Sequence, residues 1–138
     1  MSRLERRRCR ARRVCAGVLL IAMAGCSARR QELPLPYRQA EDAFRLGDYE
    51  RAAAAYKAYL RVAEEDELVP RAYYKLALAE FRRGQHAQCL AVLDEMDAEL
   101  PGRRFARVYE LRADCEQARG NGVSAVRWWE MAKSKISL

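Results

Sequence analysis

The chain has 138 residues, 51% apolar and 33% charged, a balance that excludes a disordered tail and fits one helix-rich domain. Its formal net charge of +7 would favour a nucleic-acid partner only if the charge gathered on one face. Residues 1–25 contribute +6, whereas the other 113 residues hold 19 basic and 18 acidic groups and contribute +1. This distribution argues against nucleic-acid binding.

The first segment has the layout of a secretory signal. Seven arginines lie between positions 3 and 13, and an apolar stretch of about a dozen residues follows them. That stretch is too short to cross the roughly 30 Å apolar core of a bilayer as a stable helix. A charged start, an apolar middle and small residues at the end are typical of a signal peptide. We therefore predict that residues 1–25 are removed on export.

The end of this segment, Met23-Ala24-Gly25-Cys26, resembles the lipobox of bacterial lipoproteins, although leucine is usual where Met23 stands. The resemblance implies that Cys26 is acylated, with palmitate as a usable label, and becomes the first mature residue. More than one acyl chain makes membrane attachment stable. The residue after the cysteine is Ser27 rather than aspartate. By the same resemblance, this favours the outer membrane over the inner one, with the protein facing the periplasm. An ordinary signal peptide with an incidental cysteine is the alternative.

The remainder divides into a tether and a repetitive domain. Residues 26–36 are mostly polar, contain two prolines and are predicted to connect the lipid to a domain at 37–138. In that domain Gly47, Gly84 and Gly120 recur at intervals of 37 and 36 residues. Two small residues and one large apolar residue keep fixed distances from each glycine: Ala40, Ala77, Ala113; Ala52, Cys89, Ala125; Tyr56, Leu93, Trp129.

This spacing resembles the tetratricopeptide repeat. The resemblance implies an all-α fold, in which about three antiparallel helical hairpins stack as a short solenoid. Its slightly long period is similar to that of envelope lipoproteins, such as the lipoprotein subunit of the β-barrel assembly machinery and the Tol-linked coordinator of peptidoglycan synthesis. Asp48 and Asn121 are expected N-caps, and Pro70 suits a first helical turn. The expected helices are 36–46, 49–64, 69–83, 87–100, 103–119 and 123–135.

The first helix of each hairpin lines a concave groove in that family, so the resemblance implies where a partner binds. Tyrosine and arginine are favoured anchors of protein interfaces. The candidates are Tyr37, Glu41, Arg71, Tyr74, Phe81 and Arg107, with Phe44, Leu78, Glu110 and Asp114 beside them. Packing between helices is the alternative role of Phe44 and Phe81. The expected partner is a segment of another envelope protein, extended or helical.

The last expected helix carries two adjacent tryptophans. Trp129 fits the repeated core position, which would leave Trp128 pointing to where a further repeat would lie. Repeat arrays normally end on a polar face. Trp128 is therefore a candidate contact for a partner or for a second copy of the chain, and the alternative function is that of an oligomerising structural subunit. A surface tryptophan shielded by its neighbours is the structural alternative.

The five cysteines divide by segment. Cys9 and Cys15 lie in the predicted signal and Cys26 is the expected lipid site, which leaves Cys89 and Cys115 in the domain. Export would place this pair in an oxidising compartment, where disulfides form. Two buried free thiols are the other outcome, and the residue pattern leaves both open.

Catalytic motifs are missing from the sequence. His86 is the single histidine and falls in a position of the repeat, so a histidine-based metal site or acid–base pair has little to draw on. The chain contains neither a glycine-rich phosphate loop nor a nucleophile elbow. We therefore expect a binding protein with no enzymatic activity and no cofactor or metal.

Overall fold

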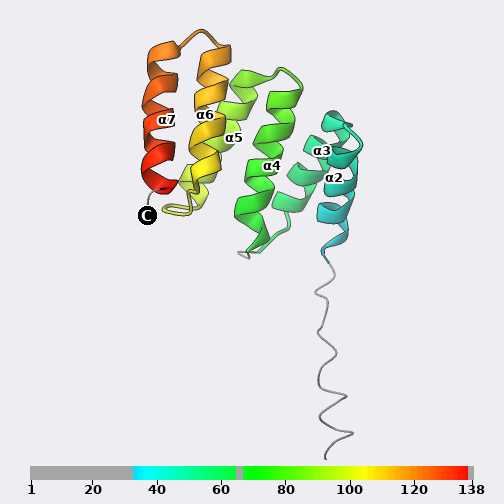
Figure 1. Ribbon diagram of the computed structural model, residues 1–138. Helices are drawn as coiled ribbons and strands as arrows, with labels where there is room; N and C mark the ends of the chain where they lie inside the picture. Colours follow the sequence, from blue (N-terminus) through cyan, green and yellow to red (C-terminus); the bar gives the residue numbers. More distant parts are fainter. Residues whose placement is uncertain (1–32, 65–66, 137–138) are drawn as a thin grey trace, which may run out of the picture. The chain divides into compact units, whose positions relative to one another are not determined.

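The computed structural model describes residues 33–64 and 67–136, and all regular structure in these residues is helical. The helices are α2 (Leu35–Arg45), α3 (Tyr49–Leu60), α4 (Leu68–Arg82), α5 (His86–Glu99), α6 (Ala106–Ala118) and α7 (Gly122–Ile136). The predicted all-α class is confirmed. Helices that follow each other in the sequence lie side by side and run antiparallel, as Figure 1 shows. The predicted signal peptide and Cys26 lie outside the described residues.

The same turn closes the hairpins α2–α3, α4–α5 and α6–α7. Gly47, Gly84 and Gly120 have φ values of 79°, 76° and 83°, which a side chain would make strained. In the first turn the Gly47 N–H donates to Phe44 O at 3.1 Å and the Asp48 N–H donates to Ala43 O at 3.0 Å. The other two turns repeat both bonds. This Schellman arrangement satisfies the last carbonyls of each first helix and reverses the chain.

Small residues lie where the helices approach most closely. The six small residues of the repeated positions are fully buried, with exposed fractions of 0%: Ala40, Ala52, Ala77, Cys89, Ala113 and Ala125. A larger side chain there would force paired helices apart. The large apolar residues that follow, Tyr56 and Leu93, are likewise 0% exposed. Trp129 was expected to match them but is only half-buried, because α7 is the last helix that the structure describes.

Some helix boundaries differ from the expected ones. Helix α3 ends at Leu60 rather than at residue 64, and a helix continued to residue 64 would bring the acidic run that begins at Glu64 against the negative end of its dipole. Helix α6 begins at Ala106 rather than at residue 103, because Phe105 is extended, with φ −114° and ψ 160°. Asp48 caps α3 as expected and accepts a bond from the Arg51 N–H at 3.1 Å. The Asn121 amide instead donates to Glu116 Oε2 at 2.7 Å.

Candidate partner-binding site

Lys75 connects the first helices of the first two hairpins. Its Nζ atom lies 3.5 Å from Glu41 Oε2 and 4.6 Å from the centre of the Phe44 ring, and both of these residues belong to α2. An ammonium group over an aromatic face is attracted by the ring as well as by the carboxylate. Two of the residues expected in the groove, Glu41 and Phe44, therefore meet α4 through a lysine that the sequence did not single out as a contact.

Tyr74 connects α4 to the third hairpin. Its half-buried ring packs edge-on against Phe105, with ring centres 5.3 Å apart. Burial raises the Tyr74 pKa, Arg107 acts in the opposite direction, and Glu110 and Asp114 raise it further. The phenol is therefore neutral at physiological pH and can both donate and accept hydrogen bonds. These interactions bring together groove candidates from α4 and α6.

The surface on this side of α2, α4 and α6 is called the first-helix face below. It comprises Glu41, Phe44, Arg71, Tyr74, Lys75, Leu78, Phe81, Phe105, Arg107, Glu110 and Asp114. Arg71 and Arg107 are exposed and stand at equivalent positions, 36 residues apart, while Glu110 and Asp114 are exposed on α6. Arginine beside partly exposed aromatic rings is the composition that protein interfaces favour. Phe105 was missed because the sequence placed it inside a helix.

Tyr37 does not belong to this face, contrary to the prediction. It is 2% exposed, and its ring packs edge-on against Tyr59 and Tyr56 with centres 5.2 and 5.8 Å away. The two tyrosines of α3 enclose the ring, whereas α5 offers Leu93 and Met96 at the equivalent positions. Tyr37 therefore holds α2 against α3 and cannot reach a partner.

Glu41 and Phe81 are only partly available. The Tyr56 hydroxyl donates to Glu41 Oε1 at 2.6 Å, so this carboxylate already has two partners within the domain. Burial, followed by this hydrogen bond, raises the Tyr56 pKa well above its usual range. Phe81 is half-buried and lies tilted against His86, with ring centres 5.1 Å apart. Packing is therefore a large part of the role of both residues.

Trp128 also differs from expectation, since it faces the domain rather than a missing repeat. The Arg112 guanidinium lies 4.9 Å from the centre of one of its rings, and the Tyr109 ring lies 6.1 Å away. Both partners are on α6, so the indole packs between the two helices of the third hairpin. The most exposed large apolar residues of α7 are Val123, Ile136 and Val126, with exposed fractions of 89%, 67% and 55%.

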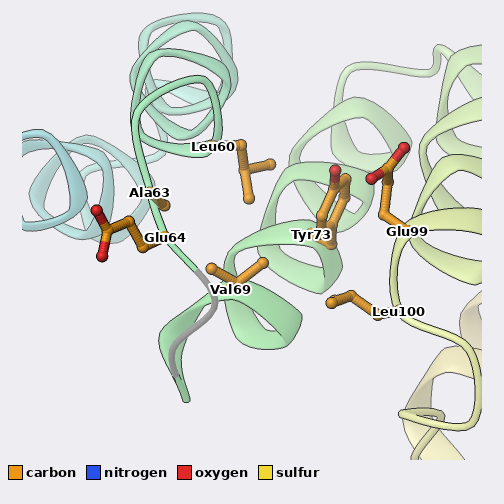
Figure 2. A pocket seen from close by; sticks show the side chains of 7 residues that line it. All are labelled: Leu60, Ala63, Glu64, Val69, Tyr73, Glu99 and Leu100. Carbon is orange, nitrogen blue, oxygen red and sulfur yellow. The ribbon is translucent and has the colours of Figure 1, made fainter.

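Two adjoining cavities open on the opposite side of α4. One, of about 190 Å³, is shown in Figure 2, and the other, of about 310 Å³, shares Leu60 and Tyr73 with it. Their remaining lining residues are Ala63, Glu64, Val69, Glu99 and Leu100 for the first, and Lys57, Arg61, Leu76, Val92 and Glu95 for the second. Helical geometry separates Tyr73 and Leu76 from Arg71 and Tyr74, so these cavities are distinct from the first-helix face.

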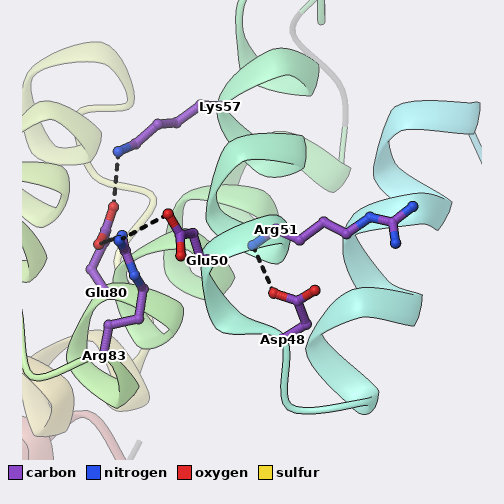
Figure 3. A network of polar contacts seen from close by, with 6 residues as sticks. All are labelled: Asp48, Glu50, Arg51, Lys57, Glu80 and Arg83. Carbon is purple, nitrogen blue, oxygen red and sulfur yellow. Dashed lines mark hydrogen bonds and ion pairs between the residues drawn. The ribbon is translucent and has the colours of Figure 1, made fainter.

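Each junction between successive hairpins holds one buried charge. Between α3 and α4, Glu80 is 1% exposed and accepts from Lys57 Nζ at 2.8 Å and from an Arg83 nitrogen at 2.7 Å (Figure 3). Between α5 and α6, Arg112 is 7% exposed and donates to Asp94 and to Asp97, the latter at 3.0 Å. A buried charge needs such partners to offset its lost hydration.

No family model matches the chain, and no curated protein matches it either. Within residues 33–64 and 67–136 no helix is long and apolar enough to cross a membrane. The same residues contain no group of three or more histidine, cysteine or acidic side chains that could hold a metal ion.

Proposed function

We propose that this protein is a lipid-anchored scaffold of the bacterial envelope, built from tetratricopeptide-type hairpins, that binds a segment of another envelope protein along its first-helix face. The observation that carries the proposal is the contact between Tyr74 and Phe105, with Arg107 acting on the Tyr74 phenol and the exposed Arg71 one turn before Tyr74 on α4. This contact joins two hairpins into one surface with an aromatic centre and cationic sides. Such a surface favours protein recognition over catalysis.

The charges of the face indicate what the bound segment carries. An apolar or aromatic side chain would cover the edge of the Tyr74–Phe105 pair, and carboxylates would lie near Arg71 and Arg107. Glu110 and Asp114, one and two turns along α6 from Arg107, would accept a basic residue. We therefore propose a segment with an apolar centre, an acidic part near Arg71 and Arg107 at the starts of α4 and α6, and a basic part near Glu110 and Asp114 further along α6.

The proposed anchor is the lipid on Cys26, at the periplasmic side of the outer membrane. Its support is the order of arginines, apolar stretch and lipobox-like end in residues 1–26. Cells that express the tagged chain would be labelled with radioactive palmitate and compared with a Cys26→Ala variant. Label in the parent protein and its loss in the variant are expected. An unlabelled parent protein of full precursor length would overturn the proposed anchor.

The binding proposal is tested by crosslinking the tagged protein in its native envelope and identifying captured proteins by mass spectrometry. Arg71→Glu and Tyr74→Ala should each lower capture of the same partner at least tenfold, since interface anchors of this kind contribute more than about 1.4 kcal/mol. Arg127→Glu, the same charge reversal on the exposed side of α7, should leave capture unchanged. Equal loss in all three variants, or in none, would rule out the first-helix face.

A structural, self-associating role is the second candidate, and the exposed valines of α7 favour it. Val123 and Val126 leave apolar side chains exposed on the last helix that the structure describes. Sedimentation of the purified protein would show an oligomer that Val126→Lys dissociates. A concentration-independent monomer would exclude this role, and an oligomer that still captures a partner after the substitution would favour the scaffold.

A further inference from the structure

Cys89 and Cys115 meet at the junction of the second and third hairpins. Cys89 belongs to α5 and Cys115 to α6, both are 0% exposed, and both are free thiols. They form part of one buried core cluster and share a side-chain hydrogen bond. Two thiols on different helices are therefore neighbours inside the domain.

The junction one repeat earlier shows that packing does not require cysteine there. Ala52 precedes Cys89 by 37 residues and Ala79 precedes Cys115 by 36, and both alanines are 0% exposed. Small residues at both positions let the second helix of one hairpin approach the first helix of the next. Because alanine meets this need at the first junction, close packing alone does not explain the two thiols at the second.

We infer that Cys89 and Cys115 form a disulfide that joins α5 to α6. One thiol loses its proton and attacks a sulfur of an oxidised thiol–disulfide carrier, which releases one carrier thiol and leaves a mixed disulfide. The second cysteine then attacks its partner's sulfur and releases the other carrier thiol. The domain thus loses two hydrogen atoms, and the carrier gains them as two thiols.

The surroundings of the pair determine when this exchange takes place. The shared hydrogen bond, followed by burial, raises the Cys89 pKa well above its usual range. A protonated thiol with no exposed surface reacts slowly. Exchange therefore belongs to the stage of folding at which α6 and α7 have not yet closed over α5. Folded, reduced protein should react slowly with an oxidant, and the disulfide should resist small reductants once it has formed.

The inference rests on the proposed export only for the source of the oxidant in the cell, so purified protein tests the two separately. The full chain would carry serine in place of Cys9, Cys15 and Cys26. It would be refolded from urea in a mixture of oxidised and reduced glutathione. Expected are a monomer lighter by two hydrogen atoms, unchanged helical circular dichroism and a Tm raised by roughly 10 °C, which a reductant reverses only after unfolding.

Cys89→Ala and Cys115→Ala in the same background serve as matched controls, and neither should gain Tm from the oxidant. Free thiols in the refolded parent protein would overturn the inference, as would a cross-linked form with lower Tm or less helix. If a single variant fails to fold, the comparison of oxidised and reduced parent protein still decides. Labelled palmitate on Cys26 tests export independently, so failure of one proposal is distinguishable from failure of the other.

Discussion

The two junctions between hairpins hold buried ions of opposite charge. At the first, the buried ion is the acid Glu80 of α4, and Lys57 of α3 reaches across to it. At the second, the buried ion is the base Arg112 of α6, and the acids Asp94 and Asp97 of α5 reach across to it. Lys57 and Asp94 are equivalent in the repeat, 37 residues apart, yet have opposite charge.

This difference in charge distinguishes the two junctions from each other. Because small residues and glycine turns repeat, packing alone would let α3 accept α6 in place of α4. That exchange would set Lys57 near Arg112, where the like charges repel and Arg112 loses both of its acidic partners. Buried ion pairs contribute little net stability but penalise wrong arrangements strongly. The repeated small residues and turns therefore make several helix pairings possible, and the buried charges select the native pairing among them.

The largest expected effect comes from removing the buried ions. Arg112→Ala should lower the free energy of unfolding by about 4 kcal/mol and Glu80→Ala by about 3 kcal/mol. Loss of Arg112 leaves Asp97, whose side chain is 19% exposed, without one partner and leaves Trp128 without its cation. Loss of Glu80 is less costly, because Lys57 and Arg83 can turn toward water. Urea unfolding of the reduced protein measures both, and a larger loss for Glu80→Ala would contradict this account.

Moving the cysteine pair tests whether the junctions are geometrically equivalent. Ala52→Cys with Ala79→Cys, in a protein carrying Cys89→Ala and Cys115→Ala, should form a disulfide under the same refolding conditions. The loop it closes is one residue longer than the native one, so stabilisation of about 3 kcal/mol is expected. The Ala52→Cys single variant is the control. Failure to cross-link while the helical content persists would mean that α3 and α4 approach differently from α5 and α6.

Much of this architecture follows from the sequence, because glycine spacing and small residues have local physical requirements. Gly47, Gly84 and Gly120 must adopt positive φ, and six small residues must lie at helix crossings, so spacing alone located them. The spacing did not predict the burial of Tyr37, because that burial depends on contacts with two aromatic rings of α3.

Long side chains that cross between helices were also beyond the repeat pattern. Lys75 over Phe44 and Arg112 over Trp128 join residues that are far apart in the sequence. Neither residue differs in type from the exposed bases around it, so the repeat gave no sign of these contacts. Phe105 was missed for another reason, because the chain is extended at Phe105, between the turn at Gly102 and the start of α6.

An intermediate effect is expected from Tyr56→Phe, which removes a hydrogen bond between the two helices of the first hairpin. Loss of the hydrogen bond to Glu41 should cost about 1–2 kcal/mol at pH 7. The folded pKa of Tyr56 lies above its unfolded value of about 10, so its contribution is complete below that pH and is lost as the pH rises further. Unfolding measured between pH 8 and 11 should therefore depend less steeply on pH in the variant, and equal slopes would contradict this assignment.

The smallest expected effects come from removing the partly exposed partners of the two buried ions. Lys57 and Asp94 have side-chain exposures of 45% and 68%, so each pair is screened by water and its loss is modest. Lys57→Ala should cost about 1 kcal/mol, because Glu80 then keeps only Arg83 beside it. Asp94→Ala should cost about 0.5 kcal/mol, because Arg112 keeps Asp97 and the Trp128 ring. The double variant should equal the sum of the two, since the junctions share no partner; a deviation above about 0.5 kcal/mol would show that they are coupled.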